Sequence, residues 1–74
     1  MAHRQIVALN RMISSREVLK KLKKDGWTVV RVRGSHTHLH HPRKEGIVTV
    51  KHPAKDFPIG TIRSMERQSG IKLL

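Results

Sequence analysis

Several residue types are missing or scarce in this 74-residue chain, and each absence narrows what the chain can do. There is no cysteine, which excludes disulfide bonds, cysteine-bound metal and a thiol nucleophile. Only 5 acidic residues accompany 16 lysines and arginines, so the formal charge is +11. This excess of positive charge favours a polyanionic partner, and RNA, DNA or an acidic protein would each satisfy it.

Long hydrophobic runs are also absent. No run approaches the roughly 18 apolar residues that span a membrane, and the run at residues 6–9 is too short for the core of a signal peptide. Neither candidate helix pairs a broad apolar face with the aromatic anchors of an interfacial helix. We therefore expect a cytoplasmic protein that has no membrane partner.

The length of the chain allows one small domain with a thin core. Residues 1–12 carry no helix cap and no sustained hydrophobic period, so we expect them to form a loosely ordered extension. The folded domain is expected over residues 13–74.

The first helix is predicted from Ser14 to about Lys24. Ser14 and Glu17 have the spacing of a capping box, and Gly26 is placed to end the helix. Four lysines cover the outer face of this helix. With this net charge, Lys20 and Lys24 are candidates for phosphate contacts, although such a charged face is as often only solvated.

Three strands and a second helix are predicted after Gly26. Gly34 and Ser35 form the turn between the first two strands, and the second helix begins at Pro58 and closes at Gly70 in a Schellman motif. Short links between consecutive strands favour an antiparallel meander. The fold class is therefore α+β, in the order α-β-β-β-α, with a three-stranded antiparallel sheet and both helices packed on one face. The expected strands are Trp27–Arg33, His36–His41 and Ile47–Lys51.

The second predicted strand is rich in histidine. Alternation places His36, His38 and His40 on one face and the apolar Leu39 on the other, so the three histidines line the open face. Histidine changes charge near neutral pH. An imidazole beside arginine and lysine can therefore serve as acid or base in phosphodiester cleavage, where a 2′-hydroxyl loses a proton.

The residues before His36 suit phosphate binding. Gly34 lets a backbone approach closely, and the hydroxyl of Ser35 can bond a phosphate oxygen. Nearby cations such as Arg31 and Arg33 would offset the extra charge of a phosphorane-like transition state. A single histidine with such neighbours needs no metal.

The residues alone leave alternatives open. The histidines could be ordinary surface residues, or His38 and His40 could hold zinc with His36, His41 or His52 as a third ligand. The high positive charge argues against a divalent cation. A basic domain could also hold RNA without cutting it.

An ordered set of short motifs along the chain resembles the HicA family of toxins over about residues 13–72. Gly-Ser-His alone would be a weak signal, but the whole set in this order is specific. The motifs are Ser15–Trp27, Val30-Arg31, Gly34-Ser35-His36, Val48–Val50, His52-Pro53, Pro58–Arg63 and Gln68–Ile71.

The resemblance implies a fold similar to the double-stranded-RNA-binding domain. It also implies a ribonuclease that cleaves mRNA without metal or other cofactor and is inhibited by a HicB-type antitoxin. His36 would be the catalytic residue, and whether it acts as base or acid stays open. His40 and His41 are expected to be substrate contacts or plain surface. The expected RNA contacts are Gly34, Ser35, Lys20, Lys24, Arg31, Arg33 and His38.

Overall fold

The computed structural model describes residues 13–74, and the extension expected at residues 1–12 lies outside the described part of the chain. The element order is α-β-β-β-α, as predicted. The elements are α2 (Ser15–Asp25), β1 (Thr28–Arg33), β2 (His36–His40), β3 (Ile47–Lys51) and α3 (Ile59–Ser69).

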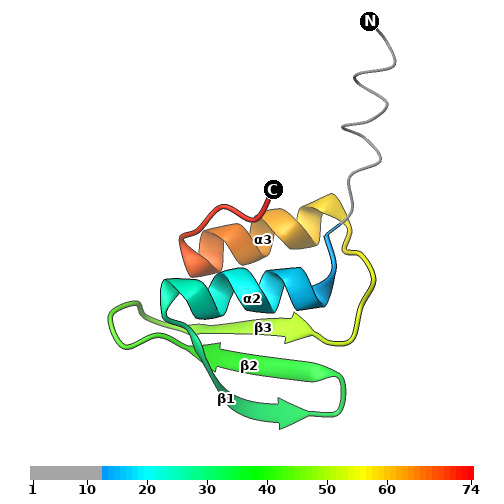
Figure 1. The fold of residues 1–74 in the computed structure, drawn as a ribbon. Coiled ribbons are helices and arrows are strands. Elements are labelled where there is room, and N and C mark those ends of the chain that lie inside the picture. Colours follow the sequence, from blue (N-terminus) through cyan, green and yellow to red (C-terminus); the bar gives the residue numbers. More distant parts are fainter. Residues whose placement is uncertain (1–12) are drawn as a thin grey trace, which may run out of the picture.

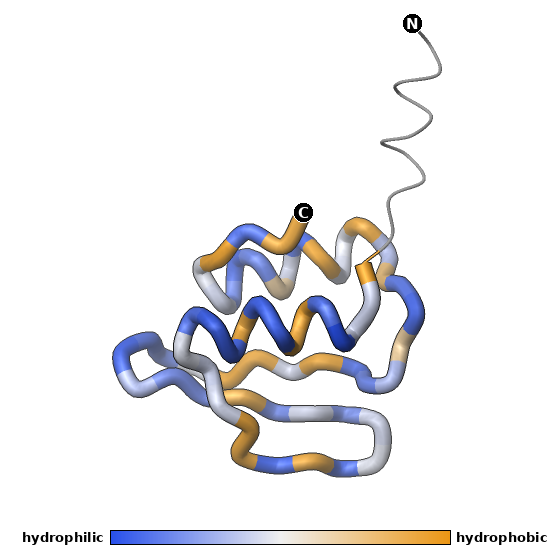
Figure 2. Tube along the Cα trace, viewed as in Figure 1, coloured by the Kyte–Doolittle hydropathy of each residue, from blue (hydrophilic) through white to orange (hydrophobic). Residues whose placement is uncertain are grey.

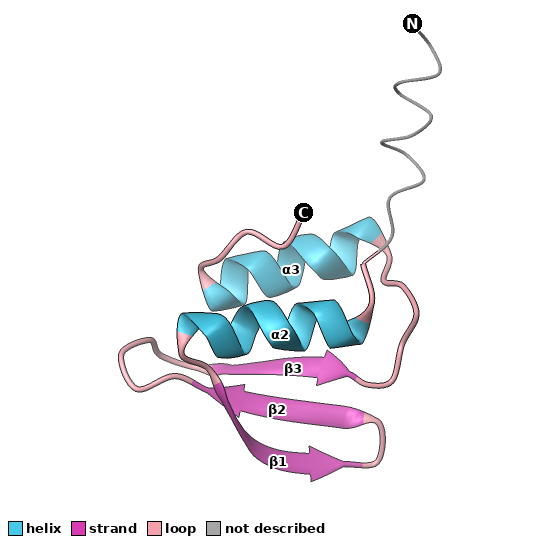
Figure 3. Cartoon of the chain, viewed as in Figure 1, coloured by secondary structure: helices cyan, strands magenta, loops and turns pink. Residues whose placement is uncertain are grey.

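The three strands form one antiparallel sheet in the order β1-β2-β3. Both helices lie on the same side of this sheet and contact β3, while β1 lies at the end of the sheet farthest from them (Figure 1, Figure 3). The predicted α+β architecture is therefore confirmed, and the opposite face of the sheet is left open.

Helix α2 begins and ends as its sequence predicts. The Ser14 hydroxyl accepts a hydrogen bond from the backbone N–H of Glu17, and the Glu17 carboxylate accepts one from the backbone N–H of Ser14. At the other end, Gly26 adopts the left-handed conformation with φ 113°. The backbone N–H of Trp27 donates to Leu22 and that of Gly26 to Lys23, which is the complete Schellman pattern.

Helix α3 closes differently from the prediction. Gly70 is left-handed, with φ 74°, and its N–H donates to the carbonyl of Glu66. The N–H of Ile71 donates instead to the hydroxyl of Ser69, at 3.3 Å. Because the second Schellman bond is replaced by a side-chain acceptor, the helix ends in the simpler left-handed motif.

The core lies between the helices and the strands β2 and β3. Its fully buried members include Leu22, Leu39, Val48 and Val50. Trp27 is also buried, but it precedes β1 rather than starting it. All six residues of β1 are exposed, and Figure 2 shows hydrophobic and hydrophilic segments alternating along this strand. The helices therefore cover only part of the sheet, which the sequence alone did not predict.

The structure corrects the expectation for His41. Strand β2 ends at His40, and His41 is buried against Trp27, with the two rings edge to face at 5.3 Å between centroids. The backbone N–H of Arg43 donates to His41 Nδ1, so Nε2 carries the hydrogen and donates to the carbonyl of Asp25 at 2.8 Å. His41 is thus a structural residue that binds the carboxyl end of α2.

Candidate nucleic-acid interface

The open face of the sheet gathers the basic and histidine residues of the hairpin in two rows. In the antiparallel register, His36 lies between Arg33 and Lys51. His38 lies in the next row, with Arg31 beside it on β1 and Thr49 beside it on β3. Directly opposed residues in a sheet point to the same side, with their Cβ atoms about 5 Å apart. The structure therefore brings Arg31, Arg33, His36 and His38 together on one face. Alternation predicted this face for the two histidines, and the pairing register adds the two arginines.

A β-bulge in β1 makes this gathering possible. The register is regular up to Val29, which pairs with Leu39, and then skips Val30 before Arg31 pairs with His38. If Val30 instead paired regularly with His38, strict alternation would turn Arg31 and Arg33 to the helix side of the sheet. A bulge shifts the phase by one residue. The two arginines consequently share the face of the histidines.

The β1–β2 turn consists of Gly34 and Ser35. Gly34 has φ 57°, a left-handed value that glycine adopts without a steric penalty. A Cβ built on Gly34 would meet nothing within 4 Å, so the space beside it is open to a ligand. The carbonyl of Ser35 accepts a hydrogen bond of 2.7 Å from the backbone N–H of His52. This bond fixes the turn to the segment that follows β3.

The two histidines of these rows differ in the hydrogen bonding of their rings. His38 Nδ1 and Thr49 Oγ1 share a hydrogen bond of 2.9 Å. His38 also lines a shallow groove of about 300 Å³ with Val30, Arg31 and Ile47. His36 is exposed, and no hydrogen bond to its ring occurs within residues 13–74. Its ring is therefore accessible to a ligand approaching the turn.

Lys51 is a member of this face that sequence reasoning missed. It is exposed and pairs with His36 across the two strands. The signal was present in the alternation of β3, where the buried Val48 and Val50 leave Thr49 and Lys51 on the open side. The pairing register of β2 with β3 was needed to place Lys51 beside His36.

Lys20 and Lys24 do not join this face. They lie on α2, in the layer that covers the other side of the sheet. Lys20 lines a separate groove of about 390 Å³ together with Lys23, Arg16, Leu19 and His52. The predicted RNA contacts are therefore split between two surfaces.

His52 belongs to the second surface. Its Nδ1 lies 2.7 Å from the hydroxyl of Ser15 at the start of α2. The Ser15 hydroxyl also accepts a hydrogen bond from the backbone N–H of Ala54. The rings of His41 and His52 are thus engaged in contacts of their own. Over residues 13–74 no group of three possible metal ligands gathers.

The acidic side chains of Asp25 and Glu66 bind cations and backbone N–H groups outside the open face. A hydrogen bond from Lys44, at 2.7 Å, holds the pKa of Asp25 below its usual value. The backbone N–H of Leu73 and the guanidinium of Arg63 lower the pKa of Glu66 to about 2. None of the open-face positions within β1, β2 and β3 carries a carboxylate. The face therefore presents only positive and neutral groups to a ligand.

The fold and this surface define a small basic α+β domain with one cationic, histidine-bearing sheet face. Residues 15–71 match the family described as the HicA toxin of bacterial toxin-antitoxin systems. The chain belongs to this family of toxins. Neither helix of the described region has the length and apolarity to cross a bilayer.

A solved structure supports the same assignment. The chain is similar to one in the structure described as "HicA3 and HicB3 toxin-antitoxin complex", with 33% sequence identity and a TM-score of 0.71. The similarity covers 84% of this chain and 100% of that chain. A comparison with curated proteins gives no match.

Proposed function

We propose that this toxin is a ribonuclease that cleaves mRNA without a metal ion, and that His36 is its catalytic residue. Residues 13–74 would form the toxin domain, acting in the cytoplasm. The observation that carries the proposal is the position of His36, exposed between Arg33 and Lys51 beside the Gly34-Ser35 turn.

The chemistry follows from this arrangement. The 2′-oxygen of a ribose attacks the adjacent phosphorus as its proton leaves, and the bond from phosphorus to the 5′-oxygen breaks as that oxygen gains a proton. His36 takes the first proton as general base or supplies the second as general acid, and water exchanges the other. Arg33 and Lys51 stabilise the negative charge that grows on the phosphorane-like transition state.

The neighbouring residues would position the RNA. The Ser35 hydroxyl and the open space beside Gly34 receive the scissile phosphate. Arg31 and His38 contact the neighbouring nucleotides of the RNA. Lys20 and Lys24 bind phosphates farther along, on the α2 surface. The positive face also suits a HicB-type antitoxin, whose acidic groups would complement it.

The test is cleavage of a long unstructured transcript by the purified protein in the presence of EDTA. We expect the wild type to cleave and His36→Ala to lose activity while keeping the wild-type melting temperature, because His36 is exposed. The matched control is His40→Ala, which removes an exposed histidine from the same face two residues from His38. It should cleave at close to the wild-type rate.

Other outcomes would contradict the proposal. Full activity in a folded His36→Ala protein would remove His36 from the mechanism. Cleavage that appears only when zinc is restored would identify a metal enzyme. Binding without cleavage would identify a non-catalytic RNA-binding module, for which the cationic face is sufficient.

A further inference from the structure

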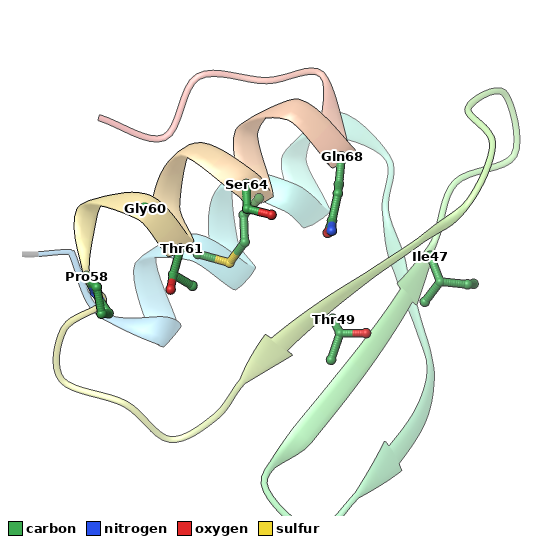
Figure 4. A pocket seen from close by; sticks show the side chains of 8 residues that line it. Ile47, Thr49, Pro58, Gly60, Thr61, Ser64 and Gln68 are labelled. Carbon is green, nitrogen blue, oxygen red and sulfur yellow. The ribbon is translucent and has the colours of Figure 1, made fainter.

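A groove of about 470 Å³ runs between β3 and α3, beside the open face (Figure 4). Among the described strands β3 pairs only with β2, so its other edge borders this groove. Thr61, Ser64 and Gln68 project from one side of α3, and Ile47 and Thr49 lie across from them on β3. Positions 61, 64 and 68 share a helix face because they are three and four residues apart.

The lining of this groove is neutral. None of the described residues that line it is charged, although charged residues make up 28% of the chain. The side chains of Thr61, Ser64 and Gln68 offer hydroxyl and amide groups, while Ile47 and Met65 add apolar surface. Because no cation is among them, these groups offer a phosphate no charge compensation. The combination suits the flat, uncharged ring of a nucleobase, which needs hydrogen bonds at its edge and apolar contact on its face.

The groove adjoins the open face of the sheet, where the phosphates are proposed to bind. Ile47 lines both this groove and the shallow groove that contains Arg31 and His38. Thr49 lines the neutral groove and shares a hydrogen bond with His38. The row of His38 and Thr49 is one row away from His36, about 6.6 Å along the strands. A nucleotide next to the scissile phosphate can therefore place its base in the groove.

We propose that this groove is a nucleobase subsite, and that Gln68 and Thr61 determine which base is accepted near the cleaved bond. The inference rests on the proposed ribonuclease function. It assigns the two requirements of RNA binding to different surfaces, with phosphates on the cationic face and a base in the neutral groove.

The experiment maps cleavage sites in a transcript that contains every dinucleotide step. We compare the wild type with Gln68→Ala and with Thr61→Val, which keeps the shape of threonine but removes its hydroxyl. Arg67→Ala is the matched control, because Arg67 is an exposed neighbour of Gln68 on α3 and does not line the groove. Melting temperatures check that each variant folds.

We expect Gln68→Ala to change the ratio between favoured and disfavoured sites by roughly fivefold or more, the effect of losing one discriminating hydrogen-bond pair. Arg67→Ala should change the rate of cleavage by the same factor at every site. An unchanged site profile in both groove variants, with wild-type cleavage intact, would overturn the subsite and leave the ribonuclease function standing. The same unchanged profile with weakened binding of the antitoxin would assign the groove to the protein partner. Absence of cleavage by the wild type would overturn the proposed function itself.

Discussion

Five histidines of the folded region differ in their surroundings although they lie close together in sequence. The rings of His38, His41 and His52 each hydrogen-bond to a protein atom, whereas within residues 13–74 those of His36 and His40 do not. Only His36 of the exposed pair lies between two cations. The local register, rather than the number of histidines, therefore distinguishes the candidate catalytic residue.

Lys51→Gln tests the cation that sequence reasoning missed. If Lys51 stabilises the charge of the transition state, its neutral variant should cleave RNA roughly tenfold more slowly, a change of about 1.4 kcal/mol in the activation barrier. The melting temperature should not change because the side chain is exposed. Cleavage kinetics with a fixed RNA measure the effect.

The matched control for Lys51→Gln is Lys72→Gln, which removes the same charge from an exposed residue outside the sheet. It should retain nearly the wild-type rate. Equal losses in the two variants would mean that only net charge matters, and the assigned position of Lys51 beside the reacting phosphate would be wrong.

Alternation within β2 predicted the open-face histidines, but it could not predict His41. The side chain of His41 is placed by the carbonyl of Asp25, 16 residues away, and by the ring of Trp27. Such contacts depend on how the end of α2 meets the sheet. A sequence pattern with a period of two residues contains no information about them.

At the scale of elements, the two ends of α2 were the most predictable features. The capping box of α2 and its terminal glycine act between residues at most five apart, so their spacing is readable in the sequence. The phase of β1 was not readable, because Val30 becomes a bulge only through its pairing with β2. The exposure of β1 depends on where the helices pack, which is also a tertiary property.

Glu66 ties α3 to the segment that follows it. One carboxylate oxygen accepts hydrogen bonds from the backbone N–H groups of Leu73, at 2.8 Å, and Leu74, at 3.2 Å. The other accepts one from Arg63. Because the pKa of Glu66 is lowered to about 2 in the folded protein, the carboxylate stabilises the fold above its ordinary pKa of 4.5. This contribution is lost as the pH falls from 4.5 through 2.

We therefore predict that Glu66→Gln lowers the free energy of unfolding at pH 7 and weakens its dependence on pH between 4.5 and 2. Urea unfolding at a series of pH values measures both effects. Glu45→Gln, at an exposed residue of the β2–β3 loop, is the control and should follow the wild-type curve. A Glu66→Gln curve parallel to that of the wild type would show that the carboxylate does not stabilise the tail.

At the scale of the whole molecule, the cations proposed to contact RNA lie on two surfaces, the open face of the sheet and helix α2. Contacts from Arg31, Arg33 and Lys51 alone would give a slope of about −2 in a plot of log affinity against log salt for single-stranded RNA. Adding Lys20 and Lys24 brings the slope to about −3.5. We predict the steeper value for His36→Ala protein, which should bind without cutting.

Replacing Lys20 and Lys24 by glutamine in the same background should reduce the slope to about −2. The measurement is a series of binding titrations at increasing salt, with Lys72→Gln as the single-charge control. A slope that stays near its original value would exclude the α2 surface from RNA binding, and the predicted contacts at Lys20 and Lys24 would be wrong.

The exposed strand β1 also affects how copies of the toxin meet one another. An uncovered strand edge offers backbone groups to any other strand. Val30 and Val32, which are 56% and 62% exposed, add apolar surface to it. Arg31 and Arg33 alternate with these valines. Two identical edges that approached each other would bring four guanidinium groups together, so the arginines oppose self-association through the strand that they occupy.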